Sequence, residues 1–259
     1  MANSMANSQA TRRLYDAEGD LHPDSGVNSE DTLNPVDGVN AEGDVHPERS
    51  LDTESDVSRR IPRAEYETGD VVGFSRYLIG KVLCSRTDAG VTSGMITETE
   101  AYCGRNDKAC HANNGLRTPR TEVLYGPPGH TYVYLCYGIH HLLNVVTNRE
   151  GLADAILIRA VMPLEGVHLM SRRRSMESHH PRLTDGPGKM TQAMGITTDD
   201  DGTDLLGDRI WIEDRGVIVP DDAIQVTERI GIDYAGEDAR KPWRFHIPKP
   251  RQVFKDWAS

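Results

Sequence analysis

Residues 95–102 read Met-Ile-Thr-Glu-Thr-Glu-Ala-Tyr, a run in which side chains of different character alternate. Successive side chains of an extended strand point to opposite faces. The run therefore predicts a strand on which Ile96, Glu98, Glu100 and Tyr102 share one face. Two carboxylates and a phenol on one face are the first indication of a chemical site.

Other stretches have the strand pattern or helical spacing of apolar residues. Strands are predicted at residues 81–86, 131–136, 142–147, 155–161, 209–213, 224–229 and 243–247, and helices at 71–79, 164–174 and 189–194. Residues 87–94 are expected to form a turn and residues 175–185 a loop. This order predicts an α+β fold with a curved, mostly antiparallel sheet and flanking helices.

Residues 1–60 differ in composition from the rest of the chain. They repeat short segments and hold 13 acidic against 5 basic residues, whereas residues 61–259 hold 27 against 24. With few aliphatic side chains to bury, such a segment cannot offset the entropy of ordering. We expect a disordered acidic tail over residues 1–60 and a single domain over residues 61–259. The domain is close to neutral, so the net charge of −11 does not exclude a DNA partner.

The composition also excludes some classes of protein. No apolar run is long enough to cross a membrane, and no secretory leader is visible. The four cysteines have no paired spacing and are expected to be reduced thiols. These features predict a protein of the cytoplasm or nucleoid, or of the nucleus if the source is eukaryotic, with no membrane partner.

Reactive side chains are concentrated between residues 98 and 159, where five of the nine tyrosines lie. One interpretation is a pocket in which phenols stack on a flat ring while a carboxylate performs proton chemistry. The other is a surface strand with solvated glutamates and tyrosines at the edge of a core. The pattern alone leaves both open.

Two further groups of residues have ordinary alternatives. Cys103, Cys110 and His111 lack the spacing of a structural zinc site, so we expect no metal. The segments Arg117–Arg120 (Arg-Thr-Pro-Arg) and Gly186–Lys189 (Gly-Pro-Gly-Lys) could contact phosphates, but each is equally compatible with an exposed turn.

Several blocks, in order, resemble the alkyladenine (3-methyladenine) DNA glycosylase family, over residues 64–248. The blocks are Glu98-Thr-Glu-Ala-Tyr102, His111, Arg117-Thr-Pro-Arg120, Gly126-Pro-Pro-Gly129, Tyr132-Val-Tyr-Leu-Cys-Tyr-Gly138, Asn144, Ile158-Arg-Ala160, Pro163-Leu-Glu-Gly166, Gly186-Pro-Gly-Lys189 and Gly236–Arg244.

The resemblance implies a monofunctional enzyme of base-excision repair. It would flip alkylated purines out of duplex DNA, hydrolyse the N-glycosidic bond and leave an abasic site. The expected substrates are 3-methyladenine, 7-methylguanine and hypoxanthine. The expected partner is double-stranded DNA with damaged purines, bound by a monomer without cofactor or metal.

The resemblance also assigns roles to individual residues. Glu100 would activate water with the help of Arg159, and Tyr137 would wedge into the duplex. The remaining assignments are a base pocket of Tyr102, His111, Tyr134 and Asn144, and DNA-backbone contacts from Arg117, Thr118, Arg120 and Lys189.

One position departs from the family pattern, and two alternative functions stay open. Thr121 stands where the family often has Asn, which puts the capping of the Arg117–Arg120 turn in question. A non-catalytic reader of damage would use the same pocket, but a Gln or Ala at position 100 would suit it better. A hydrolase of free nucleosides would not need Tyr137 or the arginine turn.

Overall fold

The computed structural model describes residues 59–255 of the chain. The expected disordered tail therefore lies outside the described residues, apart from Arg59 and Arg60. Arg60 already belongs to the fold, since it forms a β-bridge with Glu213 and an ion pair with Asp208. Within residues 59–255, no helix has both the length and the apolar character that crossing a membrane requires.

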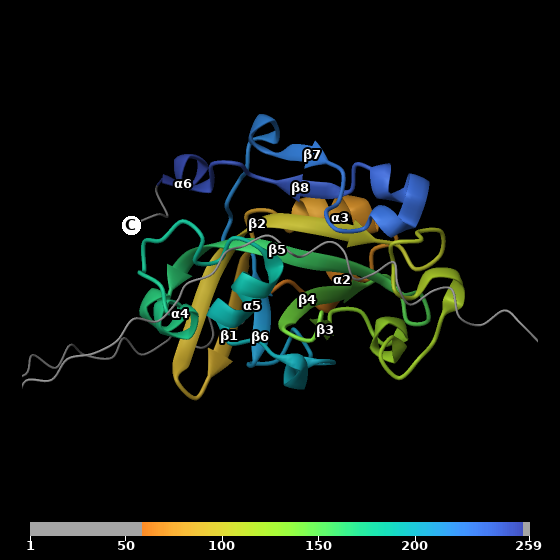
Figure 1. The fold of residues 1–259 in the computed structure, drawn as a ribbon, viewed down its shortest axis with the longest axis horizontal. Coiled ribbons are helices and arrows are strands. Elements are labelled where there is room, and N and C mark those ends of the chain that lie inside the picture. Colours follow the sequence, from red (N-terminus) through yellow and green to blue (C-terminus); the bar gives the residue numbers. More distant parts are fainter. Residues whose placement is uncertain (1–58, 256–259) are drawn as a thin grey trace, which may run out of the picture. The chain divides into compact units, whose positions relative to one another are not determined.

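The described part of the chain is built on an eight-stranded sheet with antiparallel pairing throughout (Figure 1). The main order is β3-β4-β5-β2-β1-β6, and β8 joins β2 to β7. The strands are β1 (Val82–Thr87), β2 (Gly90–Tyr102), β3 (Thr131–Cys136), β4 (His140–Thr147), β5 (Asp154–Glu165), β6 (Ile210–Glu213), β7 (Gln225–Thr227) and β8 (Arg244–His246). The predicted α+β fold with a mostly antiparallel sheet is confirmed.

Strand β2 changes partner along its length, and this change shapes the site. Its first half pairs with β1, while Glu98–Glu100 pair with β8. From Ser93 to Tyr102 the strand pairs with β5 on its other side, with register irregularities after Ser93 and between Ile96 and Thr99. The second half of β2 is therefore enclosed by strands on both sides, which buries both glutamates.

Within residues 59–255, five α-helices and five short 3-10 helices surround the sheet. The α-helices are α2 (Arg63–Tyr66), α3 (Val71–Tyr77), α4 (Val167–Arg174), α5 (Pro187–Met194) and α6 (Pro250–Val253). The 3-10 helices are η1 (Asn113–Gly115), η2 (Glu122–Tyr125), η3 (Thr198–Asp200), η4 (Asp221–Ala223) and η5 (Asp233–Arg240). Helix α3 packs on β2, and α5 packs on β4 and β5 beside α4 (Figure 1).

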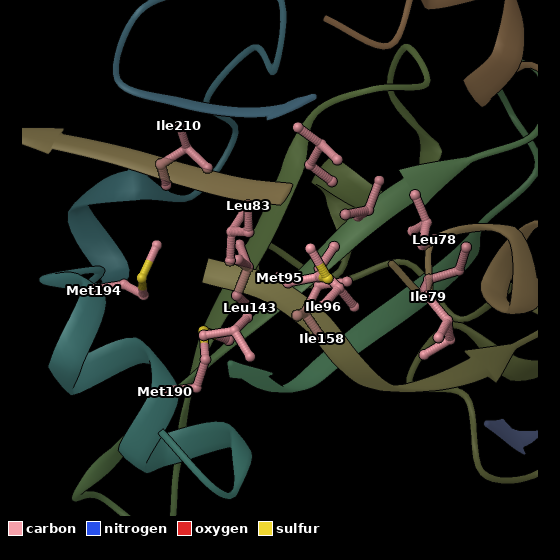
Figure 2. Packing of buried hydrophobic residues seen from close by; sticks show 14 of the residues in the cluster. Leu78, Ile79, Leu83, Met95, Ile96, Leu143, Ile158, Met190, Met194 and Ile210 are labelled. Atoms are coloured by element: carbon pink, nitrogen blue, oxygen red, sulfur yellow. The ribbon is translucent and has the colours of Figure 1, made fainter. Parts of the chain in front are cut away.

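The main core lies where these helices cover the sheet. Figure 2 shows Met190 and Met194 of α5 directed toward the strand residues Leu83 and Leu143. Residues neighbouring Glu100 on β2 face this core, since Thr99 exchanges hydrogen bonds with Ser75 of α3. Alternation along the strand then leaves Glu98, Glu100 and Tyr102 on the other face.

The structure corrects three details of the predicted elements. The turn expected at residues 87–94 is much shorter, because β1 extends to Thr87 and β2 begins at Gly90. The helix expected from Leu164 begins at Val167, because β5 continues to Glu165 and Gly166 turns the chain with a φ of 64°. Ile96 lies in the main core, because the bulge after it interrupts the period of two.

Candidate active site

The site begins as a row of directly paired residues across four strands. Glu100 of β2 pairs with Leu157 of β5, Leu157 pairs with Asn144 of β4, and Asn144 pairs with Tyr132 of β3. Paired residues on neighbouring strands place their side chains on the same face. The row thereby brings Glu100 and Tyr132, which stand 32 positions apart in the chain, onto one face of the sheet.

A cavity of about 350 Å³ lies over this row. That volume falls within the range of small-molecule sites. Seven of the predicted site residues line it, together with neighbours that the sequence pattern did not assign to a pocket. The predicted members are Tyr102, His111, Arg120, Tyr134, Tyr137, Asn144 and Arg159, and the others that matter below are Tyr132, Leu157, Ile230 and Tyr234.

Glu100 lies just behind this wall, fully buried, with both carboxylate oxygens occupied by hydrogen bonds. Its Oε2 accepts from the Tyr102 hydroxyl at 2.7 Å and lies 3.3 Å from Arg159 Nη1. Its Oε1 accepts from the backbone N–H of Ile230 at 2.8 Å. All three partners line the cavity, so Glu100 is held one contact away from its surface.

Arg159 connects Glu100 to a second carboxylate. Its Nε donates to Glu98 Oε1 at 2.8 Å, and Arg244 Nε donates to the same oxygen at 2.6 Å. Burial acts to raise the pKa of Glu98, but the charges of Arg159 and Arg244 outweigh it and hold that pKa below its ordinary value. Glu98 is therefore an anion that neutralises part of the charge beneath the cavity.

The phenol of Tyr102 is fixed as a hydrogen-bond donor. Burial and the neighbouring Glu100 raise the pKa of Tyr102 well above its ordinary value. The Arg229 guanidinium lies 4.7 Å from the centre of the Tyr102 ring and forms a fully buried ion pair with Asp107. These contacts hold the ring in one orientation.

His111 is neutral and its tautomer follows from its neighbours. Burial, with the Arg120 charge nearby, lowers the pKa of His111 to about 4. Arg120 Nε donates to the Tyr132 hydroxyl at 3.2 Å, so that hydroxyl can donate its own hydrogen to His111 Nδ1 at 2.9 Å. We therefore assign the ring proton to Nε2.

Two more aromatic contacts complete the wall on this side. The rings of His111 and Tyr134 meet edge to face with centres 4.7 Å apart, and the Arg120 guanidinium lies 4.7 Å from the Tyr134 ring centre. Within the described residues Arg120 forms no ion pair with a carboxylate. Its positive charge therefore remains available to a ligand.

Asn144 lies at the floor of the cavity between these groups. Its Nδ2 donates to the backbone carbonyl of Tyr132 at 3.1 Å, which fixes the amide against β3. Its neighbour Leu143 points into the core on the opposite face of the sheet (Figure 2). A rigid polar group at this position limits which ring edges can be accommodated.

Tyr137 lies at the tip of the β3–β4 hairpin, where the cavity opens. Its side chain is 85% exposed, and its φ is 52°, a backbone conformation that is rare for a large aromatic residue. Gly138 follows with a φ of 75°. Exposed apolar side chains gather at the same opening, which is typical of an interaction surface: Leu135, Tyr137, Ile230 and Tyr234.

The predicted backbone-contacting residues fall into two groups. Arg117 is exposed and paired with Glu122, and Thr118 exchanges hydrogen bonds with Thr121. Thr121 thus closes this turn despite its departure from the family pattern. Arg120, by contrast, lines the cavity.

Lys189 lies in the first turn of α5, which packs against the first residue of β4, His140. A Cβ on its neighbour Gly188 would lie 2.8 Å from His140 Cγ, so this close approach requires glycine. The turn of α5 that carries Lys189 therefore lies beside the start of β4, three residues after Tyr137.

All four cysteines, Cys84, Cys103, Cys110 and Cys136, are free thiols in the structure. Cys84 and Cys110 are buried, and burial raises the pKa of the Cys110 thiol to about 12. Across residues 59–255, no group of three or more His, Cys, Asp or Glu side chains has the arrangement of a metal site.

Sequence reasoning missed the contacts that reach the site from far along the chain. Arg244 binds Glu98 from β8, and the Ile230 N–H binds Glu100 from the loop before η5. Arg244 ends the Gly236–Arg244 block that resembles the family, so the sequence marked it as a residue of interest. That block did not indicate that Glu98 is its partner. The position of Arg120 in the cavity wall was also unexpected.

Comparisons with known proteins agree with this geometry. The family described as "Methylpurine-DNA glycosylase (MPG)" matches residues 65–251. A protein of Methanocella arvoryzae that carries the name of a 3-methyladenine DNA glycosylase is 44% identical over 187 residues, 72% of this chain and 91% of the relative. Proteins of the same name from Clostridium acetobutylicum and Desulfitobacterium hafniense are 42% and 40% identical, over 71% and 75% of this chain and 92% and 98% of the relatives. The chain belongs to the methylpurine-DNA glycosylase family and is a DNA glycosylase.

Proposed function

We propose that this enzyme releases alkylated purines, 3-methyladenine above all, from double-stranded DNA by hydrolysis with a water that Glu100 activates. The observation that carries the proposal is the cluster of Glu100, Tyr102 and Arg159 beneath an aromatic cavity with Tyr137 exposed at its mouth. In this proposal the enzyme acts on DNA in the cytoplasm or nucleoid, or in the nucleus if the source is eukaryotic. It works as a monomer and without a cofactor.

Access to a base within a duplex requires that the nucleotide be flipped out, at a cost of a few kcal/mol. Tyr137 would take the place of the flipped base, since its exposed ring projects from a tight hairpin. The cavity would then receive the base among Tyr102, Tyr134 and His111. Stacking on aromatic side chains, worth about 1–3 kcal/mol per base, offsets much of the flipping cost.

The aromatic side chains of the cavity suit a purine made cationic by alkylation, because the electron-rich face of a tyrosine ring attracts a cation. His111 is neutral, Tyr102 and Tyr134 are neutral phenols, and Glu98 and Glu100 lie opposite Arg159. Such a base leaves with the electron pair of the broken glycosidic bond and becomes neutral. It needs no strong acid, so 7-methylguanine is the expected second substrate, whereas hypoxanthine would first have to be protonated.

Hydrolysis requires a base for the attacking water. Glu100 Oε1, which accepts only the Ile230 N–H, has a further lone pair with which to accept a proton as the water oxygen bonds to C1′ of the sugar. Arg159 would hold the carboxylate in place, and general-base assistance is worth about 10²–10⁴-fold in rate. The products are the free purine and an abasic site.

Contacts to the DNA backbone would come from the residues around the opening. Arg120 lines the cavity and has no carboxylate partner within the described residues, and Lys189 lies in the turn of α5 beside the start of β4, so both suit phosphates. Arg117 would first have to leave Glu122. Thr118 would contribute through the turn that it forms with Thr121.

The test is the release of 3-methyladenine from methylated duplex DNA, with a methylated free nucleoside assayed in parallel. Release from the duplex and none from the nucleoside would support the proposal. Preferential binding of damaged duplex without release would identify a reader of damage, and release from the nucleoside would identify a nucleoside hydrolase.

A further inference from the structure

Glu98 is a buried carboxylate for which the proposed chemistry has no use. It lies on the same face of β2 as Glu100, two residues earlier, and is almost fully buried. Burial of a carboxylate is costly unless it is paired and hydrogen-bonded. Its pairing therefore indicates what it does.

Both arginines of the cluster meet at one oxygen atom of Glu98. Arg159 Nε lies 2.8 Å and Arg244 Nε 2.6 Å from Oε1. Arg244 is held in turn by Thr227, whose Oγ1 accepts from Nη1 at 2.9 Å. The carboxylate of Glu98 is therefore held in place by Arg244 of β8, and in that position it binds Arg159 of β5.

The bond at Nε determines where the rest of the Arg159 guanidinium points. The group is planar, so an atom bonded at Nε fixes the plane that carries Nη1. Nη1 is the atom that lies 3.3 Å from Glu100 Oε2. The contact between Arg159 and Glu100 thus depends on the contact between Arg159 and Glu98.

We propose that Glu98 is a positioning residue, which holds Arg159 so that its guanidinium fixes the carboxylate of Glu100 at the reacting centre. Arg244 supports it by holding Glu98. This inference rests on the proposed function, since it assigns Glu98 a part in the reaction that Glu100 performs.

The Glu98–Arg159 ion pair also separates two cavities. Arg159 lines the base cavity, whereas Glu98 and Arg244 line a second cavity of about 520 Å³ that is bounded by β8, α6 and the loop around Pro181. The two cavities share no lining residue. A small molecule can therefore reach Glu98 without passing through the base cavity.

The first experiment compares wild type, Glu98→Gln and the double variant Glu98→Gln with Arg244→Gln. The rate of 3-methyladenine release is measured in single turnover with enzyme in excess, beside DNA affinity and the melting temperature. In metal sites, loss of the outer residue that orients a ligand costs about 10–100-fold in affinity or activity, and this sets the scale expected here. We expect a loss of that size in both variants, with unchanged DNA affinity.

The double variant separates positioning from charge balance. It removes one negative and one positive group, so it should recover much of the stability that Glu98→Gln loses. If the rate recovers as well, the role of Glu98 is structural and the inference is overturned. Glu213→Gln is a matched control, because Glu213 is also buried and paired with an arginine, Arg215, but lines neither cavity.

The second experiment uses formate to replace the lost carboxylate. Glu98→Ala leaves an empty space beside the guanidinium groups of Arg159 and Arg244. Formate can enter this space from the second cavity. We expect formate to raise the release rate of this variant in a saturable way, and chloride at equal ionic strength to have no such effect. Equal responses to formate and chloride would contradict the inference.

The outcomes also distinguish this inference from the proposed function. A wild-type enzyme that releases no base from methylated duplex overturns the proposed function. A wild type that releases base, beside a Glu98→Gln variant of equal rate and affinity, overturns the positioning role of Glu98 alone.

Discussion

The Tyr102 hydroxyl donates a hydrogen bond of 2.7 Å to Glu100 Oε2, from two residues along the same strand. Since the raised pKa of Tyr102 keeps its phenol protonated, that oxygen of Glu100 acts as the acceptor. One side chain thus lines the cavity and also orients the carboxylate behind it. The bond links the stacking surface to the proton chemistry.

Loss of this hydrogen bond should slow the reaction more than it weakens DNA binding. A hydrogen bond to a charged group contributes about 1.5–3 kcal/mol, and 1.4 kcal/mol corresponds to a tenfold change in rate. We expect Tyr102→Phe to keep its affinity for methylated duplex and to release base about tenfold more slowly. Single-turnover rates beside equilibrium binding measure both effects, and an undiminished rate would contradict the role given to this bond.

Tyr137 should be important for function and unfavourable for stability. The left-handed backbone conformation costs a non-glycine residue roughly 1–2 kcal/mol. Because the side chain is 85% exposed, Tyr137→Gly removes little packing. We expect the unfolding free energy to stay level or rise, while base release falls strongly.

A matched control for Tyr137→Gly is Ile218→Gly, since Ile218 is 91% exposed and does not line the cavity. That variant should release base at the wild-type rate. If Tyr137→Gly also keeps the wild-type rate, the hairpin does not wedge into the duplex.

The pKa of His111 predicts a pH-dependent stability. Its folded pKa of about 4 lies below the ordinary value of 6.5, so the unfolded chain binds the proton more readily between these values. This contribution is fully present above pH 6.5 and is lost as the pH falls toward 4, by about 3 kcal/mol in all. Urea unfolding at pH 7 and pH 4.5 should show a steeper loss for wild type than for His111→Gln. Equal losses would show that His111 is not buried as a neutral group.

Asn144 should control selectivity more than rate. Its amide is held by the backbone of Tyr132, so a base that fits poorly against it cannot push it aside at low cost. We expect Asn144→Ala to lower the preference for alkylated over unmodified purines by about tenfold. The ratio of the two release rates measures this, and an unchanged ratio would remove Asn144 from the selecting residues.

The sequence predicts those parts of the site that depend on local spacing. The period of two places Glu98, Glu100 and Tyr102 on one face, and the same rule pairs Tyr132 with Tyr134. It fails at Ile96, because a bulge follows that residue.

Contacts between distant segments could not be predicted in the same way. The bond between Glu100 and the Ile230 N–H joins residues 130 positions apart, and the bond between Arg244 and Glu98 joins residues 146 apart. Both arise because β2 leaves β1 and pairs with β8 in its second half. No local pattern in residues 90–102 predicts that β2 changes its pairing partner from β1 to β8.

The most direct test of the whole account compares wild type with Glu100→Gln in the release of 3-methyladenine from methylated duplex DNA in the presence of EDTA. We expect wild type to release the base, Glu100→Gln to be slower by about 10²–10⁴-fold, and both to bind the duplex equally well. Equal release by the two proteins would contradict the role of Glu100, and wild-type activity that EDTA abolishes would contradict hydrolysis without a metal.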